Sequence, residues 1–380
     1  MKIGIITIHF GTNYGSALQA YASCRYFHEM LIPENDAHVE LINYVPKRYS
    51  VINRYFHLNT KMGIIKRIGY SIICAPSIYG YHKIFTGFLK KYTPLGKELH
   101  NHDELKACYK NYDLLVSGSD QIWNSDYNEG FDSAYFLDFA CEHSKKITYA
   151  ASSGKINFSK KELEKMEKAL SSFSGVSVRE YQMIEMLNSI GINNVKHVLD
   201  PIFLLKKEEW KKQFVKRRTI SEKYLFMYLL EGDTHNIVDI GVRIARHYGL
   251  KTVLISFGHI WNNDPRVDYY LIRKGPEQFI ELIMNSDYVV TNSFHGIAFS
   301  VNFNKQFTAF ARGKYNSRLE SISRLFDIED RFYSPDHTVT DIGDMVSNNI
   351  DYERVNLVLE EYRNKSSNFI RNMVKNTYEN

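Results

Sequence analysis

Short apolar runs alternate with longer stretches of helical spacing along most of the chain, and this alternation predicts the fold class. Most of the short runs end in turns rich in Gly, Ser, Asn or Asp, which is typical of strands that run into loops. The expected strands are 2–8, 39–44, 113–116, 146–150, 175–178, 195–199, 223–230, 251–257, 268–272, 287–291 and 306–310. The expected helices are 17–31, 160–170, one beginning at residue 179, 236–248, 276–284, 294–302, 317–326 and 352–373. Alternating strands and helices predict parallel sheets covered on both faces.

The alternation falls into two sets, separated by Asp200-Pro201 and the lysine-rich stretch 206–223. A chain of 380 residues is also too long for one ordinary core. We therefore predict an α/β fold of two Rossmann-like domains facing across a cleft, at 1–205 and 206–345. A C-terminal segment, 346–380, is expected to pack back on them as a helix. The ligand should lie beyond the carboxyl ends of the strands.

Composition narrows the class of protein without naming a function. The four cysteines are scattered, with no Cys-x-x-Cys pair, which argues against a zinc site or a disulfide framework and leads us to expect no metal. The chain starts directly on a strand-like run, and no stretch reaches the roughly 20 apolar residues that span a bilayer. We expect a cytoplasmic protein.

Charge is distributed unevenly. The stretch 41–97 has ten Lys and Arg and no acidic residue, so its charge is +10. The net charge of the whole chain is +5, so the rest of the chain carries −5. Aromatic and aliphatic residues alternate with these cations. One interpretation is a solvated pair of helices whose aromatics pack on the core. The other is a surface, within an insert at 46–97, that contacts anionic lipid on the inner face of the membrane or attracts an anionic substrate. No nucleic-acid-binding motif is present, so we expect no nucleic acid partner.

Two loops of the first half combine small residues with polar and aromatic ones. The loop at 9–16 is rich in glycine but is neither a G-x-G-x-x-G motif nor a P-loop, so a dinucleotide is not favoured. In the loop at 117–124, carboxylate and amide groups suit sugar hydroxyls and an indole offers a flat face to a sugar ring. The alternative is that Trp123 plugs the core beneath the loop. The candidate acceptor-binding residues are Asn13, Tyr14, Asp120, Gln121, Trp123 and Asn124.

Anion-binding groups are predicted in both halves. Arg179 stands at a strand-to-helix junction, where its planar fork could hold a carboxylate or phosphate; the alternative is a surface ion pair with Glu180. In the second half an apolar strand leads into Ser293, an expected N-cap, so that His295 lies in the first helical turn. Free N–H groups and the positive end of the helix dipole make this turn an anion site that contains an imidazole. The candidate donor-binding residues are Arg179, Asn292, Ser293, Gly296, Arg312 and Arg318, with His295 as the candidate catalytic residue.

The ordered set of loops resembles the polysaccharide pyruvyltransferase family. The matching stretches are N-Y-G-S-A-L-Q-A at 13–20, D-L-L-V-S-G-S-D-Q-I-W-N at 113–124, Y-A-A-S-S-G at 149–154, S-V-R-E at 177–180, L-D-P at 199–201 and T-N-S-F-H-G at 291–296. The resemblance implies a fold like that of the GT-B glycosyltransferases, with the acceptor on the N-terminal domain and the donor on the C-terminal one.

The resemblance also implies a reaction in which phosphoenolpyruvate gives a pyruvate ketal on a sugar of a surface polysaccharide or its lipid-linked precursor, with release of phosphate. Phosphoenolpyruvate is then a co-substrate and no cofactor is expected. Arg179 matches a family arginine that binds phosphoenolpyruvate, and His295 matches the catalytic histidine. Better-known members carry an arginine two residues before that histidine, where this chain has Ser293. The alternatives are a GT-B-type glycosyltransferase that uses a nucleotide sugar, and a non-catalytic, membrane-associated partner in polysaccharide assembly.

Overall fold

The computed structural model describes residues 1–31, 37–50, 63–230, 234–256, 264–311, 317–334 and 342–378. The chain divides into two units, each with its own parallel sheet. Unit 1 comprises residues 1–201 and 366–380, and unit 2 comprises residues 202–365. The predicted class, α/β with parallel sheets, is confirmed in both units.

Unit 1 is built on a four-stranded parallel sheet in the order β2-β1-β3-β4. Its strands are β1 (Lys2–Ile6), β2 (His38–Leu41), β3 (Leu114–Ser117) and β4 (Lys145–Thr148). Isolated bridges continue this sheet from β4 to the pair β5 (Ser177–Val178) and β6 (Lys196–His197). The strands fall where the sequence predicts them, with ends that differ by a few residues.

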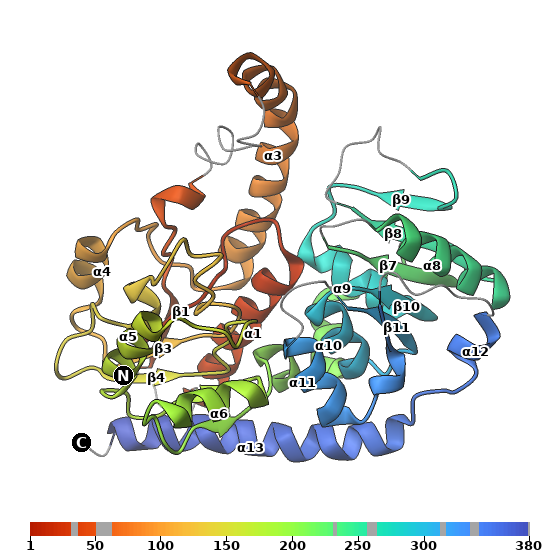
Figure 1. The fold of residues 1–380 in the computed structure, drawn as a ribbon. Helices are drawn as coiled ribbons and strands as arrows, with labels where there is room; N and C mark the ends of the chain where they lie inside the picture. Colours follow the sequence, from red (N-terminus) through yellow and green to blue (C-terminus); the bar gives the residue numbers. More distant parts are fainter. Residues whose placement is uncertain are drawn as a thin grey trace. The chain divides into compact units, whose positions relative to one another are not determined.

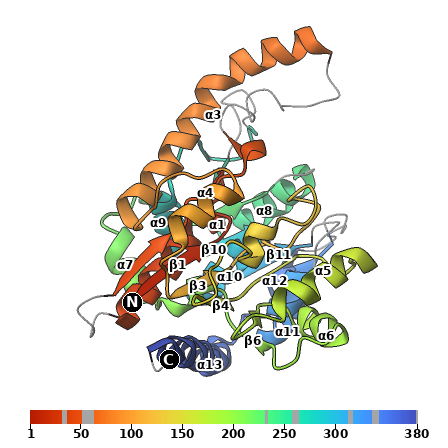
Figure 2. The same ribbon diagram turned by 90° about the vertical axis from the view of Figure 1, so that its left-hand side faces the viewer.

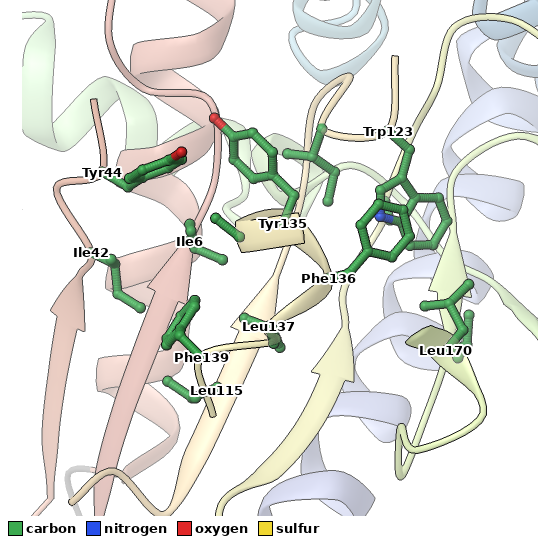
Figure 3. Packing of buried hydrophobic residues seen from close by; sticks show 14 of the residues in the cluster. Ile6, Ile42, Tyr44, Leu115, Trp123, Tyr135, Phe136, Leu137, Phe139 and Leu170 are labelled. Carbon is green, nitrogen blue, oxygen red and sulfur yellow. The ribbon is translucent and has the colours of Figure 1, made fainter. Parts of the chain in front are cut away.

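Helices cover both faces of the unit 1 sheet. The helices of the unit are α1 (Tyr14–Leu31), α3 (Ile64–Tyr92), α4 (His102–Tyr109), α5 (Lys160–Leu170), α6 (Tyr181–Ser189) and the end of α13 (Tyr352–Tyr378). One face carries a cluster in which Ile6, Ile42 and Leu115 pack with buried side chains of α4, α5 and α6. Figure 3 shows this cluster, with the indole of Trp123 lying flat against the ring of Phe136.

The described part of the basic segment contains a short 3-10 helix, Lys47–Tyr49, and one long helix, α3. α3 continues through Pro76 and extends well beyond the sheet of unit 1 (Figure 2). Near its C-terminus Phe85 packs on Tyr14 and Phe88 on Tyr21, with ring centroids 5.1 and 6.0 Å apart. Packing of aromatics on the core is therefore confirmed for this end. Residues 51–62, which include Arg54 and Lys61, lie outside the described part of the chain.

Unit 2 is built on a six-stranded parallel sheet in the order β12-β11-β10-β7-β8-β9. The strands are β7 (Tyr224–Tyr228), β8 (Lys251–Ile255), β9 (Tyr269–Leu271), β10 (Tyr288–Thr291), β11 (Phe307–Phe310) and β12 (Phe332–Tyr333). The helices are α7 (Lys207–Phe214), α8 (His235–His247), α9 (Pro276–Asn285), α10 (Phe294–Asn302), α11 (Ser317–Phe326), α12 (Ile342–Val346) and the first part of α13. The lysine-rich stretch at 206–223 thus contains a helix, α7, that the sequence did not predict.

Every residue of β7 is buried, because the strand is covered on both faces. Leu225 and Met227 point into a cluster with α8 and α12, and α8 lies along that face of the sheet (Figure 1). The alternate residues Phe226 and Tyr228 pack on Phe279 of α9, with ring centroids 5.9 and 4.8 Å apart. Side chains of a strand alternate between its two faces, so an uninterrupted apolar run is what a doubly covered strand requires.

Candidate active site

The turn between β10 and α10 has the form that the sequence predicts, with Ser293 at the N-cap and His295 in the first helical turn. The Ser293 side chain makes no capping hydrogen bond. The hydroxyl of Thr291 holds the turn instead, since it donates to the carbonyl of Tyr228 at 2.6 Å and accepts from the Ser293 N–H at 3.1 Å. A Cβ placed on Gly296 would lie 2.2 Å from the Thr291 hydroxyl oxygen, so only glycine fits there.

Asn292 ties this turn to the end of the neighbouring strand. Its Oδ1 accepts from the N–H of Leu230 at 2.7 Å, and its Nδ2 donates to the carbonyl of Leu230 at 3.2 Å. The sheet order shows that chain connections leave β7 and β10 in opposite directions, which makes this the topological switch point of unit 2. Ligands of open parallel sheets bind at such points, beyond the carboxyl ends of the strands.

His295 is 3% exposed, and its ring lies 5.2 Å from that of Phe294 in an edge-to-face arrangement. It stands among backbone N–H groups at the start of a nine-residue helix, where the helix dipole favours negative charge. An imidazole in this position can exchange a proton with a bound anion or with a group beside it.

Arg318, on α11, adds positive charge to the same end of α10. Its guanidinium carbon lies 5.8 Å from the centroid of the Phe294 ring, and the residue is buried. Among the predicted donor-binding residues, the structure thus brings Asn292, Ser293, Gly296 and Arg318 together with His295. Arg312 lies outside the described residues.

A cavity of unit 2 lies elsewhere. It has a volume of about 560 Å³ and lies at the amino ends of β7 and β8, beside the end of α8. Lys251 and Asp268 line it and form an ion pair of 2.8 Å. His295 follows the carboxyl end of a strand in the same parallel sheet, so this cavity lies at the opposite edge and is separate from the helix-start site.

Arg179 belongs to unit 1 and is enclosed there. Its Nη1 lies 2.6 Å from Oδ2 of Asp200, and its Nη2 lies 3.5 Å from Oδ1 of Asp120. Burial alone would lower the pKa of Arg179, but the carboxylates of Asp200, Glu180 and Asp120 raise it above its usual value. The surface ion pair with Glu180, the alternative interpretation, is wrong because the Arg179 side chain is 2% exposed. Glu180 itself accepts from the hydroxyl of Ser152.

Asp200 is a residue whose importance sequence reasoning missed. It lies in the quoted Leu-Asp-Pro stretch, yet no role followed from that position. Its Oδ2 also accepts from the Ser119 hydroxyl at 3.0 Å, so it joins the loop after β3 to the arginine after β5. The sequence could have indicated this partner of Arg179, because Asp200 is a carboxylate directly after a predicted strand, at the same edge of the sheet as Arg179.

The acceptor-binding prediction for Trp123 is wrong. The indole is 3% exposed and stacks on Phe136 with ring centroids 5.6 Å apart and planes 10° apart. It is therefore the core plug that the alternative interpretation described, because a fully covered ring has no face to offer a sugar.

Its neighbours in the loop form a buried hydrogen-bond network. Asp120 accepts from the Ser16 hydroxyl at 2.6 Å, and Gln121 accepts from the Asn124 side chain at 2.9 Å. Asn124 in turn accepts from the backbone N–H of Asp126 at 3.1 Å. These bonds fix the shape of the loop. A role of Asp120, Gln121 and Asn124 in acceptor binding stays a prediction.

Asn13 and Tyr14 begin α1. The Asn13 side chain accepts from the N–H of Ser16 at 3.2 Å, as a helix-capping residue does. The Tyr14 ring is fully buried against Phe85. Of the predicted residues that the structure describes, seven belong to unit 1 and five to unit 2. Within the described ranges no three His, Cys, Asp or Glu side chains gather as a metal site, and no helix is long and apolar enough to cross a membrane.

Two parallel Rossmann-like sheets, with a helix start at the switch point of the second, define a GT-B-like protein. Solved structures agree with this class. The chain matches a candidate UDP-N-acetylglucosamine 2-epimerase of Listeria monocytogenes at 10% identity and a TM-score of 0.54, over 100% of this chain and 96% of that one. It matches the UDP-N-acetylglucosamine 2-epimerase of Methanocaldococcus jannaschii, in complex with UDP-GlcNAc and UDP, at 14% identity and a TM-score of 0.50 over 99% of both chains. At these identities the likeness concerns the fold alone.

The family model described as polysaccharide pyruvyl transferase matches residues 13–314. The chain therefore belongs to the polysaccharide pyruvyl transferase family, as the motifs predicted. No curated protein matches it. Membership of this family makes the protein a transferase of polysaccharide biosynthesis.

Proposed function

We propose that the protein transfers pyruvate from phosphoenolpyruvate to a pair of hydroxyl groups on a sugar, forming a cyclic ketal and releasing phosphate. The observation that carries this proposal is the position of His295 at the start of α10, with the Arg318 guanidinium over the adjacent Phe294 ring. This group of residues combines an acid/base with positive charge for a donor that bears a carboxylate and a phosphate.

The reaction needs a proton donor and acceptor next to the donor phosphate. Protonation of the methylene carbon makes C2 of phosphoenolpyruvate electrophilic, and the first sugar hydroxyl adds to C2. The bond between C2 and the phosphate oxygen then breaks, and the second hydroxyl adds to close the ketal. Two hydroxyl protons are lost in total; one ends in the new methyl group and the other leaves with phosphate. His295 is the residue that we propose moves these protons.

Phosphate is expected to bind at the N–H groups of the first turn of α10. Ser293 can contribute a neutral hydroxyl there, while the positive charge comes from Arg318. Arg179 matches the family arginine, but it already has two carboxylate partners within unit 1. A role of Arg179 in donor binding remains part of the proposal.

The test is a comparison of the wild-type protein with His295→Ala. Each is incubated with phosphoenolpyruvate and a panel of free and lipid-linked glycosides, and products are scored by mass for an added pyruvate ketal. We expect transfer by the wild type and a loss of about 10³-fold or more in the variant, with the thermal unfolding temperature unchanged. Wild-type turnover by His295→Ala would remove the assignment.

A nucleotide-sugar glycosyltransferase is the second candidate, because the similar Methanocaldococcus jannaschii structure holds UDP-GlcNAc and UDP. The start of α10 would suit a diphosphate as well as a phosphate monoester. The released product separates the two functions: phosphate from phosphoenolpyruvate supports pyruvyl transfer, and a nucleoside diphosphate from a nucleotide sugar supports the alternative.

Contact with an anionic membrane is a further part of the proposal. Lys83, Lys90 and Lys91 are exposed on α3, and such a surface would bring the protein to a lipid-linked acceptor. Binding to vesicles that contain anionic lipid, and its loss in a triple Lys→Gln variant at these positions, would test this.

A further inference from the structure

A second group of polar and aromatic side chains in unit 1 lies at the carboxyl ends of three neighbouring strands. We call it the Arg48–Asp132 cluster; its members are Phe10, Tyr44, Arg48, Tyr49, Asp132 and Tyr135. They come from the loops that follow β1, β2 and β3, which are adjacent in the sheet order β2-β1-β3. The chain leaves β1 toward β2 on one side and returns to β3 on the other. The cluster therefore lies at the switch point of unit 1, where open parallel sheets bind ligands.

The polar centre of the cluster is Asp132. Its Oδ2 lies 3.1 Å from Nη2 of Arg48 and accepts from the Tyr44 hydroxyl at 3.2 Å, while its Oδ1 accepts from the N–H of Ala134 at 3.2 Å. One guanidinium and one carboxylate leave this centre with no net charge. A neutral pair of donors and acceptors suits a neutral ligand with hydroxyl groups better than an anion.

Two polar atoms of the cluster have no hydrogen-bond partner among the residues that the structure describes. The Tyr135 side chain is fully buried, and its hydroxyl has no partner in the part of the chain that the structure describes. The same holds for Nε of Arg48, which is a buried donor. The Tyr135 ring lies 5.9 Å from the ring of Tyr44 in an edge-to-face arrangement, which places it beside the cluster. Figure 3 shows the hydroxyl groups of Tyr135 and Tyr44 on the same side of the core.

Aromatic rings border this polar centre. The rings of Phe10 and Tyr49 lie 4.9 Å apart, and the Arg48 guanidinium lies 5.1 Å above the Tyr49 ring. Both rings are partly exposed, as is the Arg48 side chain, which is 25% exposed. Flat apolar faces beside a guanidinium–carboxylate pair match the two kinds of surface on a sugar ring, its C–H face and its hydroxyl edge.

We propose that the Arg48–Asp132 cluster is a carbohydrate subsite, which binds the hydroxyl edge of a sugar through Arg48 and Asp132 and places its ring against Phe10 and Tyr49. The proposal rests on the proposed function, since it assigns the glycan acceptor to this cluster. Buried polar groups without partners are rare in folded proteins, and a bound hydroxyl or a water held beneath it gives the Tyr135 hydroxyl and Arg48 Nε their missing bonds.

Three variants of the full-length protein test the subsite. Tyr135→Phe removes only the unpartnered hydroxyl, and Arg48→Lys keeps the charge but removes Nε and the planar fork. The control is Tyr109→Phe, which removes a hydroxyl that donates to Glu40 at 2.6 Å, outside the cluster. If the Tyr135 hydroxyl had only a structural role, Tyr135→Phe would leave the stability of the protein unchanged or raise it, and sugar binding would not change.

The measurement is saturation-transfer NMR with the methyl glycosides of galactose, mannose and N-acetylglucosamine, in the absence of phosphoenolpyruvate. We expect at least one glycoside to bind the wild type and to bind Tyr135→Phe and Arg48→Lys about tenfold more weakly. Tyr109→Phe should bind as the wild type does. The affinity for phosphoenolpyruvate, measured by calorimetry, should be the same in all four proteins.

Wild-type affinity in both cluster variants would overturn the subsite, and so would a wild-type protein that binds none of the glycosides. Equal weakening in Tyr109→Phe would also overturn it, because the effect would then be a general loss of structure. If the wild type binds a glycoside but forms no ketal from phosphoenolpyruvate, the proposed function fails while the subsite stands.

Discussion

Nη1 of Arg179 and Oδ2 of Asp200 lie 2.6 Å apart, and the two side chains are 2% and 0% exposed. A pair this deeply buried has lost nearly all hydration, so each charge depends on the other. The pair joins the ends of β5 and β6 in unit 1, and through Ser119 it also fixes the loop after β3. Asp200 is therefore a positioning residue for Arg179.

Replacing Asp200 with Asn should destabilise unit 1 strongly. The amide keeps the shape of the carboxylate but leaves the arginine without its closest counter-charge, and breaking a buried pair costs about 3 kcal/mol. Urea unfolding of Asp200→Asn measures the loss. Glu164→Gln, at an exposed position of α5, is the control and should stay within about 0.5 kcal/mol of wild type. A comparable small change in Asp200→Asn would show that the pair contributes little.

Gly296→Ala should lower both stability and activity. The added Cβ would lie 2.2 Å from the Thr291 hydroxyl oxygen, which itself fixes the turn before His295, so we expect a loss of about 1–3 kcal/mol. Gly87→Ala is the matched control. It lies within α3 with no atom within 4 Å of the added Cβ, and the same substitution there should stabilise by about 0.5–1 kcal/mol. Thermal unfolding of both variants measures the two changes in stability. A change of the same sign in both variants would contradict the prediction.

Arg318→Lys should weaken phosphoenolpyruvate binding. Lysine keeps the charge but lacks the planar fork that matches a carboxylate or phosphate, so the KM for phosphoenolpyruvate should rise about tenfold, with a smaller change in kcat. Arg324→Lys, an exposed position on the same helix, should leave both constants unchanged. Steady-state phosphate release with a saturating acceptor measures them. An unchanged KM in Arg318→Lys would remove this arginine from the donor site.

His9 should make stability depend on pH. Burial lowers its pKa below 6.5, although hydrogen bonds from its ring to Asn43 and to the Thr7 carbonyl oppose this effect. The unfolded chain therefore takes up the proton first as pH falls, so the free energy of unfolding decreases below about pH 6.5 and levels off below the pKa of the folded state. The slope from this group is at most about 1.4 kcal/mol per pH unit.

Comparison with His9→Gln isolates this contribution from the other titrating groups. Urea unfolding at pH 7.5 and 5.5 should show a smaller decrease for the variant than for the wild type. Equal decreases in the two proteins would mean that His9 keeps an ordinary pKa in the folded protein.

Local patterns predicted most of the elements. The helices 160–170, 294–302 and 317–326 begin and end at the predicted residues, because their capping residues and apolar spacing are contained in the sequence nearby. α7 was missed because its lysines resemble a linker, although Trp210 and Phe214 are buried at helical spacing. α3 was expected only as part of a possible pair of helices in the basic segment, without bounds, and it continues through Pro76 as one helix.

The candidate site, too, could be predicted only where it depends on neighbouring residues in the sequence. The strand, N-cap and histidine of the β10–α10 turn are local and were predicted, whereas the position of the Trp123 indole depends on Phe136, which the loop's own sequence does not place. The Arg48–Asp132 pair joins residues 84 positions apart. Contacts of this kind depend on the order of the strands in the sheet, which the local pattern of residues does not specify.

The course of α13 has a consequence for how the protein is made. Unit 2 is complete at residue 365, but unit 1 includes residues from 366 onward, and the Leu199 N–H donates to the Ser366 hydroxyl at 2.9 Å. Domains usually fold in the order in which they leave the ribosome. Here the first 201 residues emerge long before the helix that completes their unit, so the second unit can fold before the first is finished. A ribosome that stalls in α13 would therefore hold an N-terminal unit that still lacks its last helix.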